Sequence, residues 1–183
     1  MTIEEYQHTL AAATGHGWGF LAAYGLTWLV CSWCWRRWGA RVGAYCTLFQ
    51  GMVALPLALW LTALTPGPAR PEMDGMQGLS VLLSMGQLLG LPIVIYLVAR
   101  GQYSRAPLAM VILLAVHFAP YSWLYATPLY LVMGGAISVG AAFADASARR
   151  GHAVADPDVL GSARVCLSTG VVMLFSAGVA WVL

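Results

Sequence analysis

Six long runs of apolar residues determine what this chain can fold into. Each run is about twenty residues long, the length at which a helix crosses a hydrocarbon core about 30 Å thick. The runs cover residues 15–35, 43–64, 77–99, 107–124, 128–145 and 162–183. Because lipid satisfies no free backbone N–H or C=O group, each run is expected to be helical. The sequence therefore predicts an all-α, polytopic integral membrane protein, one domain made of a bundle of about six transmembrane helices.

The composition leaves no room for a separate water-soluble domain. Of the 183 residues, 60% are hydrophobic and 9% are charged, whereas charge occupies roughly a quarter of positions in a soluble domain. The longest polar connections, 65–76 and 146–161, are too short to fold alone. Glu4 and Glu5 precede the first run and no arginine does, so we expect no cleavable signal peptide.

The basic residues predict the orientation. All are arginines, and eight of the nine follow the first, third or fifth run: Arg36, Arg37, Arg41, Arg100, Arg105, Arg149, Arg150 and Arg164. Only Arg70 falls on the other side. By the positive-inside rule, this predicts a multi-pass protein of the inner (plasma) membrane with both termini outside. The net charge of +2 is explained by topology, and nucleic acid is not an expected partner.

Three polar side chains at membrane depth are the main candidates for a site, because each carries a desolvation cost unless it is paired. They are Gln50, Gln87 and His117. The glutamines either join helices by hydrogen bonds or contact a ligand. His117 either bonds the carbonyl group that Pro120 leaves unpaired or belongs to a site.

Aromatic residues surround that histidine in AVHFAPYSWLY. Tyr121 is four residues after His117 and shares its helical face. Trp123 and Tyr125 belong either to an interfacial aromatic belt or, with Trp18 and Trp28 of the first run, to a substrate site.

Acidic residues gather on the same predicted outer side. Glu5 and Asp74 could act as proton donors at the mouth of a cavity that contains His117 and Tyr121, or could be there because loops are solvated. Asp145, at the inner end of the fifth run, either pairs with Arg149 or serves as an acid. Cys31 and Cys34 have C-x-x-C spacing, but nothing completes a zinc site, and two buried thiols on one helix face are the alternative to redox chemistry. The sequence indicates no metal and no cofactor.

Three stretches, AVHFAPYSWLYATPLYLVMGGAISVG, LSMGQLLGLPIVIYL and FQGMVALPLALWL, resemble a family of small bacterial membrane proteins of unknown function. In that family a pattern close to A-H-x-x-P-Y-x-W-x-Y follows a helix with glutamine and proline. The resemblance places weight on Gln87, Pro92, His117, Pro120, Tyr121, Trp123 and Tyr125. In size, helix number and aromatic content the chain is also loosely similar to small membrane-bound bacterial terpene cyclases.

Three functions are therefore open. The first is an enzyme in which an acid protonates an apolar isoprenoid and aromatic rings stabilise the carbocation. The second is a small-molecule transporter or channel subunit, with proline-broken helices at Pro56, Pro92 and Pro120. The third is an accessory subunit that packs against other helices. The expected partners are the lipid bilayer and an apolar small molecule, and a homo-oligomer is left open.

Overall fold

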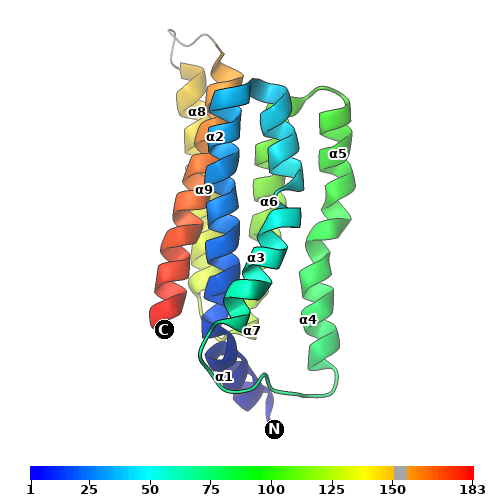
Figure 1. The fold of residues 1–183 in the computed structure, drawn as a ribbon, viewed down its shortest axis with the longest axis vertical. Coiled ribbons are helices and arrows are strands. Elements are labelled where there is room, and N and C mark those ends of the chain that lie inside the picture. The colour runs from blue at the N-terminus through cyan, green and yellow to red at the C-terminus, as the bar shows by residue number, and fades with distance from the viewer. Residues whose placement is uncertain (151–155) are drawn as a thin grey trace.

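The computed structural model describes residues 1–150 and 156–183, apart from the side chains of Gln77, Ser84 and Arg149. Within that part of the chain every regular element is helical, which confirms the all-α class (Figure 1). The α-helices are α1 (Ile3–Thr14), α2 (Trp18–Phe49), α3 (Gly51–Ala63), α4 (Met76–Met85), α5 (Leu91–Ala99), α6 (Ala106–Phe118), α7 (Tyr121–Leu124), α8 (Leu129–Arg150) and α9 (Pro157–Val182). Short 3-10 segments, η1 (Gly15–Gly17), η2 (Gly86–Gly90) and η3 (Tyr103–Arg105), join some of them.

Four helical stretches are long and apolar enough to cross a membrane. They are Gly78–Ala99, Tyr103–Leu124, Leu129–Ala148 and Pro157–Val182. A fifth is added if the bent pair Ile3–Phe49 and Gly51–Ala63, which meets at 41°, counts as one span. The chain is therefore a polytopic membrane protein.

That bent pair contains both of the first two predicted runs, because α2 folds back on itself at Gly39. Gly39 has φ 77° and ψ −169°, a conformation that favours glycine. The limbs 18–38 and 40–49 then run antiparallel: Trp35 Nε1 donates to Thr47 Oγ1 at 3.0 Å, and Thr27 Oγ1 donates to Gln50 Oε1 at 3.1 Å. Figure 1 shows this hairpin continuing into α3.

The break in the second limb lies at Gln50, six residues before the expected proline. Pro56 is inside α3, and the carbonyl oxygen of Gln50 accepts from both Val53 N and Ala54 N. Pro56 removes the hydrogen bond to the carbonyl group of Met52, which lies inside α3, so the break at Gln50 is not at the proline. The α4–α5 stretch breaks at η2, and Pro120 separates α6 from α7.

An additional helix, α1, covers one end of the bundle. Thr2 and Glu5 form a capping box at its start, with Thr2 N donating to Glu5 Oε2 at 2.7 Å. Its buried residues Tyr6 and Leu10 pack against Met76 and Leu124. Both chain termini lie at this end (Figure 1), and His8 and Leu183 line the same surface depression.

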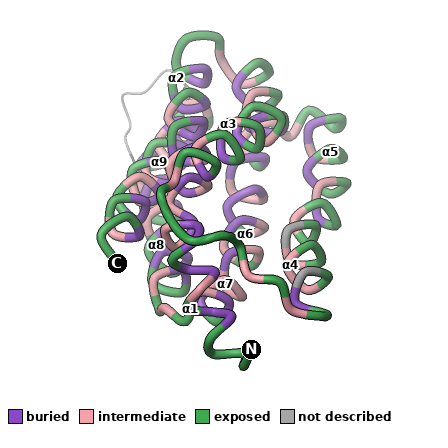
Figure 2. Tube along the Cα trace, turned by 60° about the horizontal axis from the view of Figure 1, so that its bottom comes forward, coloured by how far each residue is buried: buried purple, intermediate pink, exposed green. Residues whose placement is uncertain are grey.

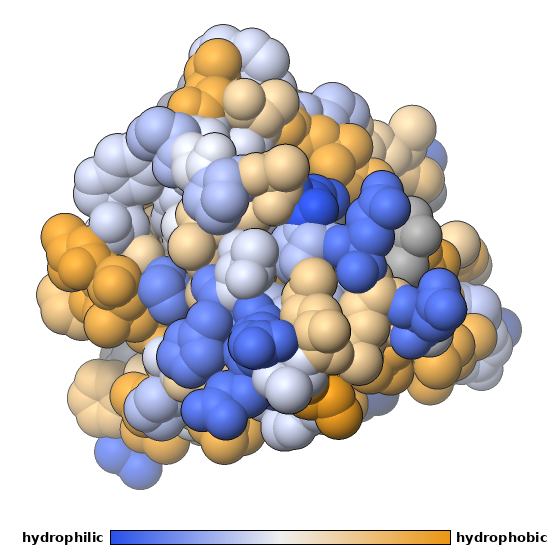
Figure 3. Space-filling model, turned by 90° about the horizontal axis from the view of Figure 1, so that it is seen from below, coloured by the Kyte–Doolittle hydropathy of each residue, from blue (hydrophilic) through white to orange (hydrophobic). Residues whose placement is uncertain are grey.

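The packing is uneven across the bundle. α2, α6, α8 and α9 share one hydrophobic core, to which α5 adds Val94 and Val98, whereas most residues of α4 and α5 are exposed (Figure 2). In a membrane those exposed apolar side chains face lipid. Seen from the α1 end, hydrophilic residues gather in the middle of the face and apolar residues lie around them (Figure 3), as expected for a bundle end that emerges from lipid.

Candidate functional site

A cavity of about 320 Å³ opens inside the α1 end of the bundle. The residues that line it come from α1, α2, α3, α4, α6, α7 and α8, from η1 and η2, and from the connections that follow α3 and α7. The lining residues are Tyr6, Leu10, Thr14, Gly17, Phe20, Tyr24, Leu55, Arg70, Pro71, Glu72, Ser80, Gln87, His117, Phe118, Tyr121, Leu124, Tyr125 and Tyr130. The volume is at the small end of the range of ligand pockets, and seven of these residues are aromatic.

The structure brings Gln87, His117 and Tyr121 to this one cavity. The His117 and Tyr121 rings lie 5.5 Å apart between centroids, which is the result of their spacing of four residues across Pro120. Gln87 reaches the cavity from η2, where the α4–α5 stretch is broken.

His117 has an unsatisfied ring nitrogen. Its Nδ1 is buried and has no hydrogen-bond partner among the described residues, so the bond to a carbonyl group freed by Pro120 is not formed by that atom. The imidazole also packs against Phe118, with centroids 5.2 Å apart. A buried ring nitrogen without a partner is available to a bound molecule.

Tyr121, Tyr125 and Tyr130 form a continuous aromatic wall with Phe118. The Tyr125–Tyr130 and Tyr121–Tyr130 centroids are 5.6 Å and 5.8 Å apart, and Tyr121 and Tyr125 are separated by 6.1 Å. The faces of aromatic rings are electron-rich and attract positive charge.

The wall is attached to the N-terminal part of the chain. The Tyr130 hydroxyl donates to the carbonyl oxygen of His16, and a Cβ at Gly17 would lie 2.5 Å from that hydroxyl. Gly17 has φ 76°, so both its conformation and its contact favour glycine. On the other side, Gln7 Nε2 donates to the carbonyl oxygen of Trp123 at 2.7 Å.

Of the remaining predicted binding residues, only Tyr125 lines the cavity. Trp18 Nε1 donates to Thr65 Oγ1 at 2.8 Å, and the ring packs edge-on against Trp181. Gln50 is buried and bonds Thr27, as expected for an amide that joins helices.

Two of the predicted tryptophans are also elsewhere. Trp28 is completely buried in the core away from the cavity, and its Nε1 has no partner within the described part of the chain. Trp123 is 50% exposed on the outer surface, where an interfacial tryptophan is expected.

The predicted acids do not line the cavity. Glu5 caps α1 with both its side chain and its backbone, and Asp74 is exposed beyond the lining residues. Asp145 lies near the opposite end, where a Cβ at Gly161 would be 3.2 Å from its Oδ1. The ion pair considered between Asp145 and Arg149 lies outside the described residues.

Glu72 occupies the position expected for those acids, since it is the one acidic residue that lines the cavity in the described structure. Arg70, Tyr6, Tyr24 and Tyr130 were also missed by the sequence analysis. For Tyr6 the available signal was the spacing of Tyr6 and Leu10 in a segment with a capping box. For Glu72 and Arg70 no periodicity was present, because the connection that carries them is irregular.

The cysteines lie in the other half of the bundle. Cys31 and Cys34 are both 2% exposed, and Cys166 Sγ lies 3.9 Å from Thr47 Oγ1. In the described residues no three histidine, cysteine or acidic side chains are grouped so as to hold a metal ion.

No curated protein and no solved structure matches the chain. A family model does match, over residues 3–177, which includes every residue of the cavity. It describes a family of unknown function, in agreement with the resemblance seen in the sequence. The chain therefore belongs to the family of unknown function DUF7010.

Proposed function

We propose that the cavity is the substrate site of a membrane-embedded enzyme that acts on an apolar isoprenoid. The observation that carries this proposal is the aromatic wall formed by Phe118, Tyr121, Tyr125 and Tyr130 beside His117. Ring faces stabilise a carbocation without reacting with it as water would. The cavity volume of about 320 Å³ suits a folded isoprenoid of modest length.

The reaction in this proposal is a proton-initiated cyclisation. Glu72 gives its proton to an alkene carbon or an epoxide oxygen of the substrate, and the positive charge that develops on carbon is held by the tyrosine faces. A carbon–carbon double bond then attacks the cation and closes the ring. His117 takes the final proton from a neighbouring carbon, which forms a new double bond. The substrate gains one proton and loses one, and no oxidant or reductant is needed. Solvent returns a proton to Glu72, which is exposed, and removes the proton from His117.

The test uses purified protein in detergent and the terminal epoxide of farnesol, with products identified by gas chromatography and mass spectrometry. Cyclic products are expected from the wild-type protein. Glu72→Gln should reduce turnover at least about a hundredfold, the lower end for general acid catalysis. Asp74→Asn, two residues away and outside the lining, is the matched control and should leave turnover unchanged. Absence of cyclic products from this and from alkene isoprenoids would remove the proposal.

Transport of a small molecule is the second candidate, favoured by the helix breaks. The breaks at Gln50, at η2 and at Pro120 interrupt three of the predicted spans, and Gln87 of η2 and Leu55 of α3 line the cavity. Broken helices around a central site are a feature of transporters. Proteoliposomes distinguish the two functions: uptake of an unmodified isoprenoid favours transport, and chemical conversion favours the enzyme.

The proposed orientation places the cavity toward the outside of the inner membrane. It rests on the distribution of the arginines, because eight of them lie on the predicted inner side of the membrane and Arg70 alone lies on the other side. Reporter fusions after Leu183 and at Gly101, in the connection between α5 and α6, should report opposite compartments. A cytoplasmic reporter at Leu183 would reverse the orientation.

A further inference from the structure

Arg70 is an unusual residue for its position. It is the one arginine predicted on the outer side, where the positive-inside rule does not account for it. It lines the cavity, and it makes no hydrogen bond or ion pair with any residue that the structure describes. The guanidinium donors of Arg70 are therefore available to a bound molecule.

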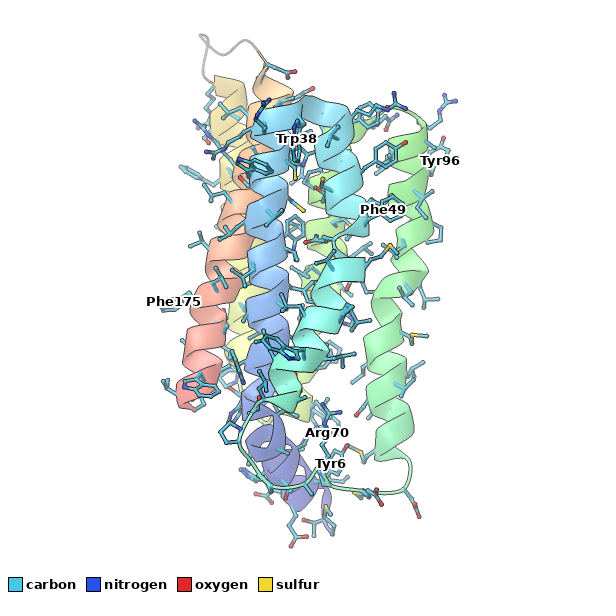
Figure 4. All side chains as sticks on the ribbon, in the orientation of Figure 1. Tyr6, Trp38, Phe49, Arg70, Tyr96 and Phe175 are labelled. Atoms are coloured by element: carbon cyan, nitrogen blue, oxygen red, sulfur yellow. The ribbon has the colours of Figure 1, made fainter. Side chains whose placement is uncertain are left out.

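Hydroxyl groups lie beside this guanidinium. Figure 4 shows Arg70 and Tyr6 next to each other at the α1 end of the bundle, and both line the cavity. Both are also electrostatic neighbours of Tyr125. A guanidinium with neighbouring phenol donors is suited to an anion with several oxygen atoms, because arginine donates two parallel hydrogen bonds to phosphate or carboxylate.

The lining changes character along the cavity. Arg70 and Glu72 come from the connection 64–75, which lies at the α1 end of the bundle, whereas Phe118, Tyr121 and Tyr130 of the aromatic wall come from helices and Tyr125 follows α7 directly. An anionic group bound at Arg70 would thus be attached to an apolar part in contact with the rings. This is the arrangement for an amphipathic molecule with one charged end.

We propose that the natural ligand is an isoprenoid with an anionic head group, a phosphate ester, and that Arg70 binds this head group. The proposal rests on the proposed isoprenoid function and adds the substrate class.

The experiment is calorimetric titration of the purified protein with three probes: farnesyl monophosphate, farnesol and inorganic phosphate. The wild-type protein should bind farnesyl monophosphate about ten- to a hundredfold more tightly than farnesol, the range for a hydrogen bond to a charged group. Arg70→Gln should abolish that difference and leave farnesol binding unchanged.

Arg105→Gln is the matched control, since the Arg105 side chain is exposed and bonds Gln102 in the connection between α5 and α6. It should keep the wild-type preference. Equal binding of farnesyl monophosphate and farnesol to the wild-type protein would overturn the head-group proposal and leave the isoprenoid function standing. Binding of neither isoprenoid would overturn both. Inorganic phosphate that binds as tightly as the ester would show a free-phosphate site and would also overturn the proposal.

Discussion

α9 and the α4–α5 stretch are both apolar spans of this membrane protein, yet they are packed differently. Of the most apolar window in α9, 44% of the residues are buried inside the protein, against 12% for the window in Gly78–Ala99. α9 buries small residues such as Gly161, Ala163 and Ala177 against α2 and α8. The α4–α5 stretch instead approaches the bundle at Gly90, where a Cβ would overlap Leu113 of α6.

The difference indicates two roles. Small residues allow the backbones of α9 and α2 to come close, and close packing is what holds helices together when lipid is as apolar as the side chains. The α4–η2–α5 stretch lies at the outside of the bundle. It contributes Gln87 and Ser80 to the cavity and turns apolar side chains toward lipid. Variants in α9 should therefore change stability, and variants in the α4–η2–α5 stretch should change ligand binding.

The largest effect is expected at Gly170 in α9. A Cβ there would lie 2.9 Å from the carbonyl oxygen of Gly25 and 2.8 Å from Leu29 Cδ2. Gly170→Leu should separate α9 from α2 and cost about 3 kcal/mol or more, the upper part of the range for overpacking. Gly178→Leu is the control on the same helix, because nothing lies within 4 Å of its Cβ position. Size-exclusion profiles and Tm in detergent measure both, and equal profiles would contradict the scaffold role of α9.

The second effect compares two large apolar side chains. Met173 of α9 is completely buried, and Leu89 of η2 is 85% exposed. Met173→Ala leaves a cavity and should destabilise the protein by about 2 kcal/mol or more. Leu89→Ala should change the free energy of unfolding by less than about 0.5 kcal/mol, as for a surface position. Denaturation of the two variants in the same detergent tests the pair. A larger loss of stability for Leu89→Ala would mean that another chain covers the α4–η2–α5 stretch.

How far the sequence predicts this molecule follows from the same contrast. The apolar runs were sufficient for the all-α class because lipid requires helices whatever the side-chain pattern. The packing of the runs was not predictable, since α9 and the α4–α5 stretch have the same apolar character and differ only in how much of each is buried. The helix α1 was missed because its residues are mixed in polarity and form no run.

The site shows the same limit. A spacing of four residues placed His117 beside Tyr121, and Gln87 lines the same cavity. The acids could not be placed, because they lie in connections whose conformation has no period. Glu72 lines the cavity and Asp74 does not, a difference of two residues that no composition argument detects. Trp28 and Trp18 were expected near a substrate, but long-range packing puts one in the core and the other against Thr65.

The third prediction concerns backbone opening. Because few residues of Gly78–Ala99 are buried, its amides in detergent should exchange with solvent at least about tenfold faster than those of Pro157–Val182. Hydrogen exchange followed by mass spectrometry measures both segments in one sample. A bound ligand should slow exchange near Gln87 and leave α9 unaffected. Equal exchange of the two segments without ligand would show that Gly78–Ala99 is as firmly packed as the core.

The smallest effect is expected from replacing one glycine with alanine in each of the two spans, which should change stability in opposite directions. Gly86, at the start of η2, has helical φ −56° and ψ −35°, and nothing lies within 4 Å of its Cβ position. Gly86→Ala should therefore stabilise the protein by about 0.5 kcal/mol, because alanine fits the conformation and loses less entropy on folding. Gly170→Ala should destabilise the protein, because its Cβ meets the Gly25 carbonyl oxygen. The two Tm shifts should have opposite signs in the same detergent. If both variants lost stability, Gly86 would be packed against a partner chain. The difference in packing between α9 and the α4–η2–α5 stretch would then hold only for the isolated chain.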